Sequence, residues 1–319
     1  MGAQLRIYRR RIKSVQSTKK ITKAQELIAA SRIAKAQARV HAARPYAEEL
    51  NHALAELSGD TTVTHPMLTG VENPRRAGIL LVTSDRGLAG GYNANAIKAA
   101  NELAARLEGD GKQVERYVIG RKGVAYYTFR RVELSGAWTG FSEQPKFANA
   151  KPAADAVVEA LIATSEGTVG EGAESNAGSR PGIDELWLIF TEFVNSVTQT
   201  PQAVQLSPVK GSAGRTAHAE DDAATPEASA SYEFEPDAAE LIAALLPRYI
   251  TSRIFSGLLE SAASESAARR QAMKSATDNA TELIRTYTRL ASQARQAEIT
   301  QEISEIVGGA DALAASGEE

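Results

Sequence analysis

The sequence predicts an α/β domain inserted between two long terminal helices that pair as an antiparallel coiled coil. Three observations support this. From Leu5 to Leu57, apolar or alanine residues recur at alternating intervals of three and four, which is the period of a coiled-coil seam. The same pattern returns from Ala276 to Ala297. Between these stretches, short β-rich runs alternate with helical segments, as is typical of an α/β sheet domain.

The N-terminal helix is expected within residues 1–60. Its seam includes Ile33 and Val40, and the pattern is interrupted only at Lys19, Thr22 and Glu26. A helix of about 50 residues is roughly 80 Å long at about 1.5 Å per residue. An average domain helix has only about a dozen residues, so we expect this helix to protrude.

The C-terminal helix is expected within residues 238–319, where strong helix formers continue without proline after Pro247. Its predicted seam includes Leu283, Tyr287 and Leu290. Alanines on both seams would let the two backbones approach closely. We therefore expect each helix to cover the narrow apolar seam of the other.

The middle of the chain, residues 75–210, is predicted to form a Rossmann-like α/β domain. Strands are expected at 78–84, 114–120, 185–194 and 203–209, and helices near 92–108, 121–128 and 149–164. Two segments rich in Gly, Ser, Ala and acidic residues cannot bury enough apolar surface to order themselves. We expect a mobile loop at 165–182 and an acidic low-complexity loop at 211–237.

Composition excludes several classes of chemistry. The chain has no cysteine, so disulfides and thiolate chemistry are excluded, and its four histidines lack the spacing of a metal site. No apolar stretch approaches the roughly 20 residues of a membrane span. The N-terminus also lacks the hydrophobic core of a secretion signal. We expect a cytoplasmic protein that binds no metal and does not insert into a membrane.

Charge is distributed unevenly along the chain. Residues 1–44 contain twelve Lys and Arg against the single acid Glu26, whereas residues 217–247 contain eight Asp and Glu and no Lys or Arg. This split implies a partner for the basic end. Tyr8 and Tyr46 are too few aromatics for single-strand stacking, so an acidic protein is favoured over nucleic acid. A nucleic-acid tether remains an alternative, and it would bind with an affinity that falls steeply with salt.

A glycine-rich stretch, SDRGLAGGYN (84–93), follows the first apolar run. Such a turn from strand to helix can cradle phosphate. It lacks the Lys-Ser/Thr of a P-loop and the spacing of a dinucleotide fingerprint. We expect a structural turn with Asn93 as the helix N-cap, and no catalytic residues. A nucleotide-dependent enzyme is the alternative, and it requires that the isolated chain bind ATP. The turn residues are Asp85, Gly87, Gly90, Gly91 and Asn93.

Four segments carry a resemblance to a known family. They are RIKSVQSTKKITKAQELIAASRIAKAQ (11–37), SDRGLAGGYN (84–93), SESAARRQAMKSATDNA (264–280) and ITQEISEIVGGADA (299–312). Together and in this order they resemble the gamma subunit of F-type ATP synthases. The 165–182 segment is similar to an extra loop in actinobacterial relatives.

The resemblance implies a central rotor shaft that couples proton flow through a membrane c-ring to ATP synthesis. Its implied partners are three alpha and three beta subunits, the epsilon subunit and the c-ring. In this family ATP, ADP and Mg bind the alpha and beta subunits, so no cofactor is expected on this chain. The implied location is peripheral, on the cytoplasmic face of the cell membrane.

The resemblance also implies two sets of contacts with the beta subunits. Basic residues of the N-terminal helix would meet an acidic segment of beta, and a second set near the C-terminus would hydrogen-bond to a beta loop. The first set is Arg9, Arg10, Lys13, Lys19, Lys20 and Lys23, and the second is Arg295, Gln296, Thr300 and Glu302.

Overall fold

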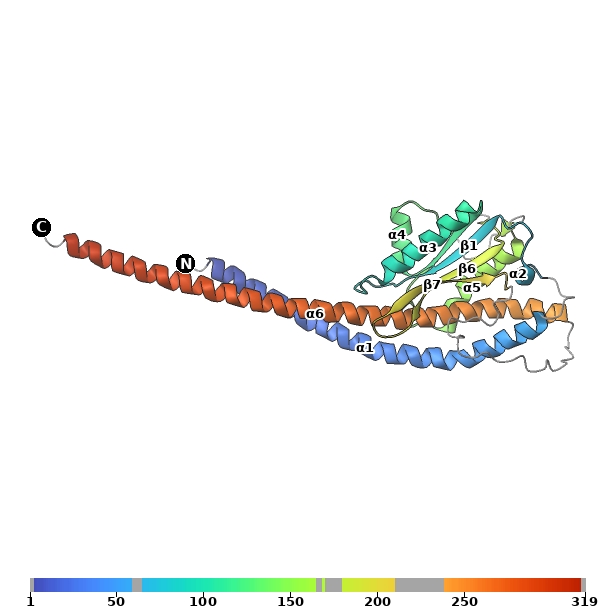
Figure 1. Ribbon diagram of the computed structural model, residues 1–319, viewed down its shortest axis with the longest axis horizontal. Helices are drawn as coiled ribbons and strands as arrows, with labels where there is room; N and C mark the ends of the chain where they lie inside the picture. The colour runs from blue at the N-terminus through green and yellow to red at the C-terminus, as the bar shows by residue number, and fades with distance from the viewer. Residues whose placement is uncertain (1–2, 59–64, 165–167, 170–179, 210–237, 317–319) are drawn as a thin grey trace. The chain divides into compact units, whose positions relative to one another are not determined.

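The computed structural model describes residues 3–58, 65–164, 168–169, 180–209 and 238–316 (Figure 1). It divides into two compact units, one of residues 1–28 with 270–319 and the other of residues 29–269. The predicted loop at 211–237 lies outside the described residues. The predicted loop at 165–182 is described only at 168–169 and 180–182.

Two long helices contribute to both units. Helix α1 (Ala3–Ser58) has 56 residues, and helix α6 (Ala238–Ser316) has 79. Alanine, leucine, glutamate, glutamine and arginine are frequent in both sequences, and these residues lose little side-chain freedom in a helix. The predicted long terminal helices are therefore confirmed, and α1 is slightly longer than the expected 50 residues.

The first unit contains the terminal helix pair, which we define as residues 3–28 of α1 and 270–316 of α6. The Oγ1 atoms of Thr22 and Thr277 are hydrogen-bonded at 2.7 Å. The rings of Tyr8 and Tyr287 lie 6.4 Å apart between centroids. Rising numbers on α1 face falling numbers on α6, so the pair is antiparallel, as predicted.

The seam of this pair differs from the expected one in two respects. Thr22 is only 8% exposed, so the seam continues through a position where the apolar pattern is interrupted. The predicted seam residue Leu283 is 45% exposed, and the neighbouring Ile284 is half-buried instead. The buried side of α6 runs through Thr277, Ala280, Ile284 and Tyr287. Thr277 belongs to it because its hydroxyl is hydrogen-bonded to Thr22 of α1. Leu290 is half-buried.

The second unit is built on a five-stranded sheet of order β3-β2-β1-β6-β7. Strands β1, β2, β3 and β6 are parallel, and β7 runs antiparallel at the edge. The predicted strands correspond to four of these five. The fifth, β3, has only three residues and was not predicted. The strands are β1 (Arg76–Val82), β2 (Gln113–Ile119), β3 (Gly136–Trp138), β6 (Glu185–Phe193) and β7 (Gln199–Ser207). Two short strands, β4 (Thr168–Val169) and β5 (Arg180–Pro181), pair separately.

Helices cover both faces of the sheet, and each face has its own core (Figure 1). Ile79 and Leu81 pack with α3 (Tyr92–Gly109) and α4 (Arg121–Phe129). Leu80 and Val82 pack on the other face with α2 (Pro66–Thr69), α5 (Phe147–Ala163), α6 and the end of α1. Burial on both faces explains why β1 is a continuous apolar run rather than an alternating one. In α1 of this unit, Ile33 is 6% exposed and Val40 is half-buried.

Candidate functional site: the glycine-rich turn and the terminal helix pair

The glycine-rich turn joins β1 to α3 at the carboxyl end of β1. Strand β1 lies at the centre of the sheet, between β2 and β6. After β1 the chain adds β2 and β3 on one side of it, and then adds β6 and β7 on the other side. In open α/β sheets, ligands bind at such a reversal point, outside the carboxyl ends of the strands. The turn therefore occupies the place where a nucleotide would be expected.

Asp85 organises the turn through its carboxylate. The backbone N–H groups of Arg121, Gly140 and Ser142 donate to it at 3.1, 2.8 and 2.9 Å. Burial by itself raises the pKa of Asp85, but these hydrogen bonds outweigh it, and the pKa lies below its ordinary value. The carboxylate thus joins three loops at one edge of the sheet.

Replacing Asp85 with alanine leaves these three N–H groups without their acceptor. Ser142 is buried, whereas the bonds from Arg121 and Gly140 are exposed to solvent. We expect the free energy of unfolding of the full chain to fall by about 1–3 kcal/mol, the cost of one unsatisfied buried donor. Since the folded pKa is lowered, the stabilisation is present above the ordinary value of 3.8 and is lost as the pH falls through the folded pKa. Denaturant titrations at several pH values would measure both effects.

Asp155 provides a control for this substitution. Its carboxylate pairs with Lys151 at 2.6 Å, but both side chains are more than half exposed. Asp155→Ala should cost about 0–1 kcal/mol. Equal losses for the two variants would contradict the role given to Asp85.

The rest of the turn differs in part from the expected arrangement. Gly90 has a φ of 55°, which favours glycine, whereas Gly91 has a φ of −81°. The prediction that Asn93 caps α3 is wrong, because the helix begins at Tyr92 and its N-cap residue is Gly91. The Asn93 side chain instead accepts a hydrogen bond from the backbone N–H of Ser84 at 2.9 Å. Gly87 contributes its carbonyl, which faces Arg269.

Helix α6 contacts the glycine-rich turn and the elements on either side of it. The Tyr92 hydroxyl donates to the Ser261 carbonyl at 3.3 Å, and the Thr191 N–H donates to Ser261 Oγ at 3.2 Å. The Arg269 guanidinium donates to the carbonyls of Arg86 and Gly87, each at 3.4 Å. The turn therefore presents carbonyl oxygens to a side chain of the same protein, rather than free N–H groups to a phosphate.

Arg269 belongs to a buried charged group that the sequence patterns did not reveal. We call it the Arg269 cluster and define it as Arg32, Arg86, Glu143, Glu265 and Arg269. Glu265 and Arg269 form its buried centre, Glu143 and Arg32 are partly buried, and Arg86 reaches it from the surface with 71% of its side chain exposed. Arg269 is 5% and Glu265 1% exposed, and they pair at 2.6 Å. Burial raises the pKa of Glu265, against the opposing charge of Arg269. A Glu and an Arg four residues apart among Ala and Ser, in SESAARR, were the available signal.

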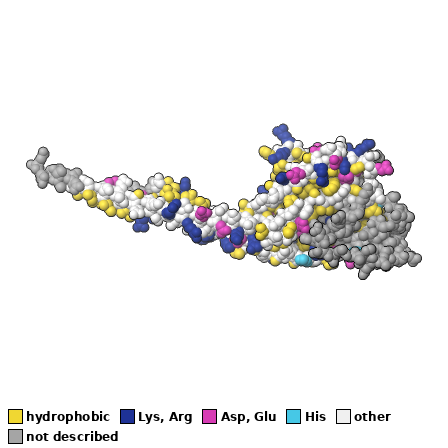
Figure 2. Space-filling view, viewed as in Figure 1, with side chains coloured by type: hydrophobic (Ala, Val, Ile, Leu, Met, Phe, Trp, Pro, Cys, Tyr) yellow, Lys and Arg dark blue, Asp and Glu magenta, His cyan; other side chains and the backbone are white. Residues whose placement is uncertain are grey.

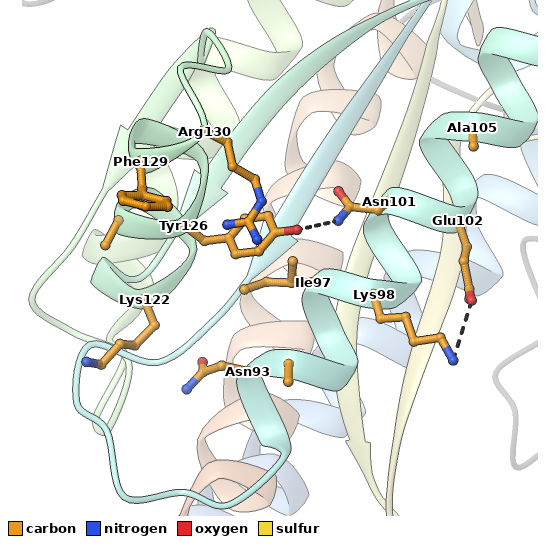
Figure 3. A pocket seen from close by; sticks show the side chains of 12 residues that line it. Asn93, Ile97, Lys98, Asn101, Glu102, Ala105, Lys122, Tyr126, Phe129 and Arg130 are labelled. Carbon is orange, nitrogen blue, oxygen red and sulfur yellow. Dashed lines mark hydrogen bonds and ion pairs between the residues drawn. The ribbon is translucent and has the colours of Figure 1, made fainter.

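A pocket of about 920 Å³ lies between α3 and α4 (Figure 3). Its polar groups are largely engaged with one another. The Asn101 amide donates to the Tyr126 hydroxyl at 3.1 Å, Lys98 pairs with Glu102 at 3.7 Å, and the Arg130 guanidinium lies 3.7 Å above the Tyr126 ring. The remaining lining is mainly apolar, so the pocket lacks the converging free polar groups of a ligand site.

The described part of the chain holds no group of three or more His, Cys, Asp and Glu side chains that could bind a metal ion. Within those same residues, no helix has the length and apolar character required to traverse a bilayer.

The basic candidates lie on α1 in the terminal helix pair, where Figure 2 shows Lys and Arg beside hydrophobic side chains. Lys23 is exposed and forms an ion pair with Glu26 at 3.1 Å. Lys19 is half-buried at the seam. The other four are exposed, and they are Arg9, Arg10, Lys13 and Lys20.

The second set of candidates lies near the end of α6. All four side chains, Arg295, Gln296, Thr300 and Glu302, are exposed, and the Thr300 hydroxyl donates to the Gln296 carbonyl at 3.0 Å. An apolar stripe accompanies them, which the sequence patterns did not single out. Its members are Ile299, Ile303, Ile306 and Val307, between 46% and 71% exposed. Large exposed apolar residues that cluster in this way mark an interaction surface.

Known structures share this fold. A chain of the Euglena gracilis mitochondrial ATP synthase matches with a TM-score of 0.65 and 15% identity, over 100% of this chain and 97% of that one. A chain from the central stalk and c-ring structure of the Tetrahymena thermophila mitochondrial ATP synthase matches with a TM-score of 0.54 and 21% identity, over 80% of this chain and 99% of that one.

Sequence comparison identifies the family. The ATP synthase family model matches residues 4–313. The ATP synthase gamma chain of Saccharopolyspora erythraea is 53% identical over 99% of this chain and 100% of its own length. The ATP synthase gamma chain of Frankia casuarinae is 54% identical over 98% of this chain and 99% of its own length. The chain therefore belongs to the ATP synthase gamma chain family.

Proposed function

We propose that this chain is the central rotor shaft of an F-type ATP synthase. The observation that carries the proposal is the antiparallel terminal helix pair, in which helix α6 carries an exposed stripe of isoleucine and valine near its C-terminal end. A long exposed stripe of this kind requires a surrounding partner. The solved chains of the same fold come from structures of the ATP synthase central stalk with the c-ring, of F1 with the c-ring, and of the rotor.

The proposed partners are three alpha and three beta subunits around the terminal helix pair, with the epsilon subunit and the c-ring at the α/β domain. Helix α1 carries exposed basic side chains and α6 an exposed apolar stripe, so each beta subunit would meet a different surface of the helix pair. A difference in contact free energy between faces shifts the binding equilibrium of each beta site in turn. The exposed basic side chains of α1 attract acidic groups on beta.

In this proposal the chain performs no covalent chemistry and binds no nucleotide or Mg, which the alpha and beta subunits hold. The contacts of α6 with the glycine-rich turn support this assignment, because Arg269 of α6 binds the carbonyls that the turn presents. The complex would place this chain peripherally, at the cytoplasmic face of the cell membrane.

Reconstitution of the complex in proton-tight vesicles tests the function. With this chain present, ATP hydrolysis should drive proton transport; without it, hydrolysis and transport should become independent. Measuring phosphate release and vesicle acidification in the same sample gives both rates. Full coupling in its absence would refute the proposal.

A further inference from the structure

The Arg269 cluster links four segments that are distant in the sequence. Arg32 lies on α1, Arg86 in the glycine-rich turn, Glu143 in the connection between β3 and α5, and Arg269 with Glu265 on α6. Glu143 is the common partner, because its carboxylate pairs with Arg32, with Arg86 at 3.5 Å and with Arg269 at 3.4 Å. One carboxylate thus connects both long helices to the turn.

Arg269 adds a second connection between α6 and the turn. Its guanidinium pairs with Glu265 and also donates to the carbonyls of Arg86 and Gly87. A guanidinium is planar and offers five donors in a fixed geometry, so bonds to several acceptors define its position closely. Replacement by another cation is therefore not equivalent.

The cluster lies at the border of its compact unit. The compact unit begins at Ala29 on α1 and ends at Arg269 on α6. Arg269 is therefore its last residue, and Arg32 lies three residues after its first. Apolar contacts between helices hold them together but tolerate small sliding movements, since they are not directional. The pairs of Arg269 with Glu265 and Glu143 are largely shielded from water and are directional. The best-attested use of buried ion pairs is to fix register rather than to add stability.

We propose that the Arg269 cluster is a positioning device, which locks α1, α6 and the glycine-rich turn in one register so that a load on the two helices is carried by the α/β domain. Glu143 and Arg269 are its principal positioning residues. The consequence for coupling depends on the proposed rotor function, whereas the fixed register is a property of the chain itself.

The register is tested by spin labels on the full chain. The chain has no cysteine, so Leu88→Cys in the turn and Arg248→Cys on α6 give a clean pair at exposed positions. We expect a narrow distance distribution that broadens in Glu143→Gln and in Arg269→Lys. Lys151→Gln, which removes an exposed pair of 2.6 Å, is the control and should leave the distribution narrow.

The mechanical role is tested in the reconstituted complex. In Glu143→Gln and Arg269→Lys we expect a loss of proton transport per ATP hydrolysed while hydrolysis itself is retained, and Arg32→Gln should add little to Glu143→Gln because both remove the same pair. Unchanged distance distributions would overturn the positioning role. A broadened distribution with unchanged coupling would overturn the mechanical role. An uncoupled wild-type complex would instead contradict the rotor function.

Discussion

Replacing Gly120 with alanine is expected to destabilise the α/β domain by on the order of 4 kcal/mol or more, the range that points to a specific structural fault. Gly120 joins β2 to α4 with a φ of 103°, a conformation that side chains rarely adopt. An added Cβ would lie 2.1 Å from the backbone oxygen of Thr83. That oxygen cannot move away, because the Thr83 N–H is held by the Ile119 carbonyl at the end of β1.

Gly109 is the matched control for this prediction. It ends α3, and a Cβ added there would meet no atom within 4 Å. Gly109→Ala should be neutral or stabilising by up to about 1 kcal/mol, the helix propensity difference. Denaturant unfolding of the two variants compares them directly, and a Gly120→Ala protein as stable as Gly109→Ala would show that the close approach to Thr83 is not rigid.

The architecture was predictable because its signals are periodic. The seams of α1 and α6 repeat over many turns, and strands β1 and β6 contain long apolar runs, GILLV and LWLIF. An error at one position therefore does not change the predicted fold class. Strand β3 could not be predicted because three residues are too few to show an alternation of apolar and polar side chains. The prediction that Leu283 lies in the seam is wrong because the seam contains a polar residue, Thr277. An apolar pattern favours the neighbouring Ala276 instead, and this shifts the predicted seam by one residue.

The candidate site was only partly predictable, for a different reason. The turn residues were identified from composition, but the function of Asp85 depends on N–H groups from two other loops. The Arg269 cluster combines residues of four segments, and consecutive segments are more than 50 residues apart in the sequence. No local sequence pattern can show that such residues meet. The beta-contact residues depend on partners that lie outside this chain, so they stay predictions.

Substituting Arg269 with methionine is expected to lower the free energy of unfolding by about 3–5 kcal/mol, because it leaves the Glu265 carboxylate buried without its counter-charge. Glu265 is 1% exposed, and its Oε2 already lacks a hydrogen bond. Burial holds the pKa of Glu265 above its ordinary value of 4.5, and loss of Arg269 raises it further. The penalty should therefore be small below that ordinary value and grow as the pH rises through the folded pKa.

A second substitution separates the buried charge from lost packing. Adding Glu265→Gln to Arg269→Met removes the uncompensated carboxylate, so the double variant should recover much of the loss at neutral pH and show little pH dependence. Lys151→Met, which breaks an exposed ion pair of equal length, should cost only about 0–1 kcal/mol. Denaturant unfolding of the four proteins across pH would decide the matter. If Arg269→Met is as mild as Lys151→Met, water reaches Glu265, and the cluster is too loosely held to fix any register.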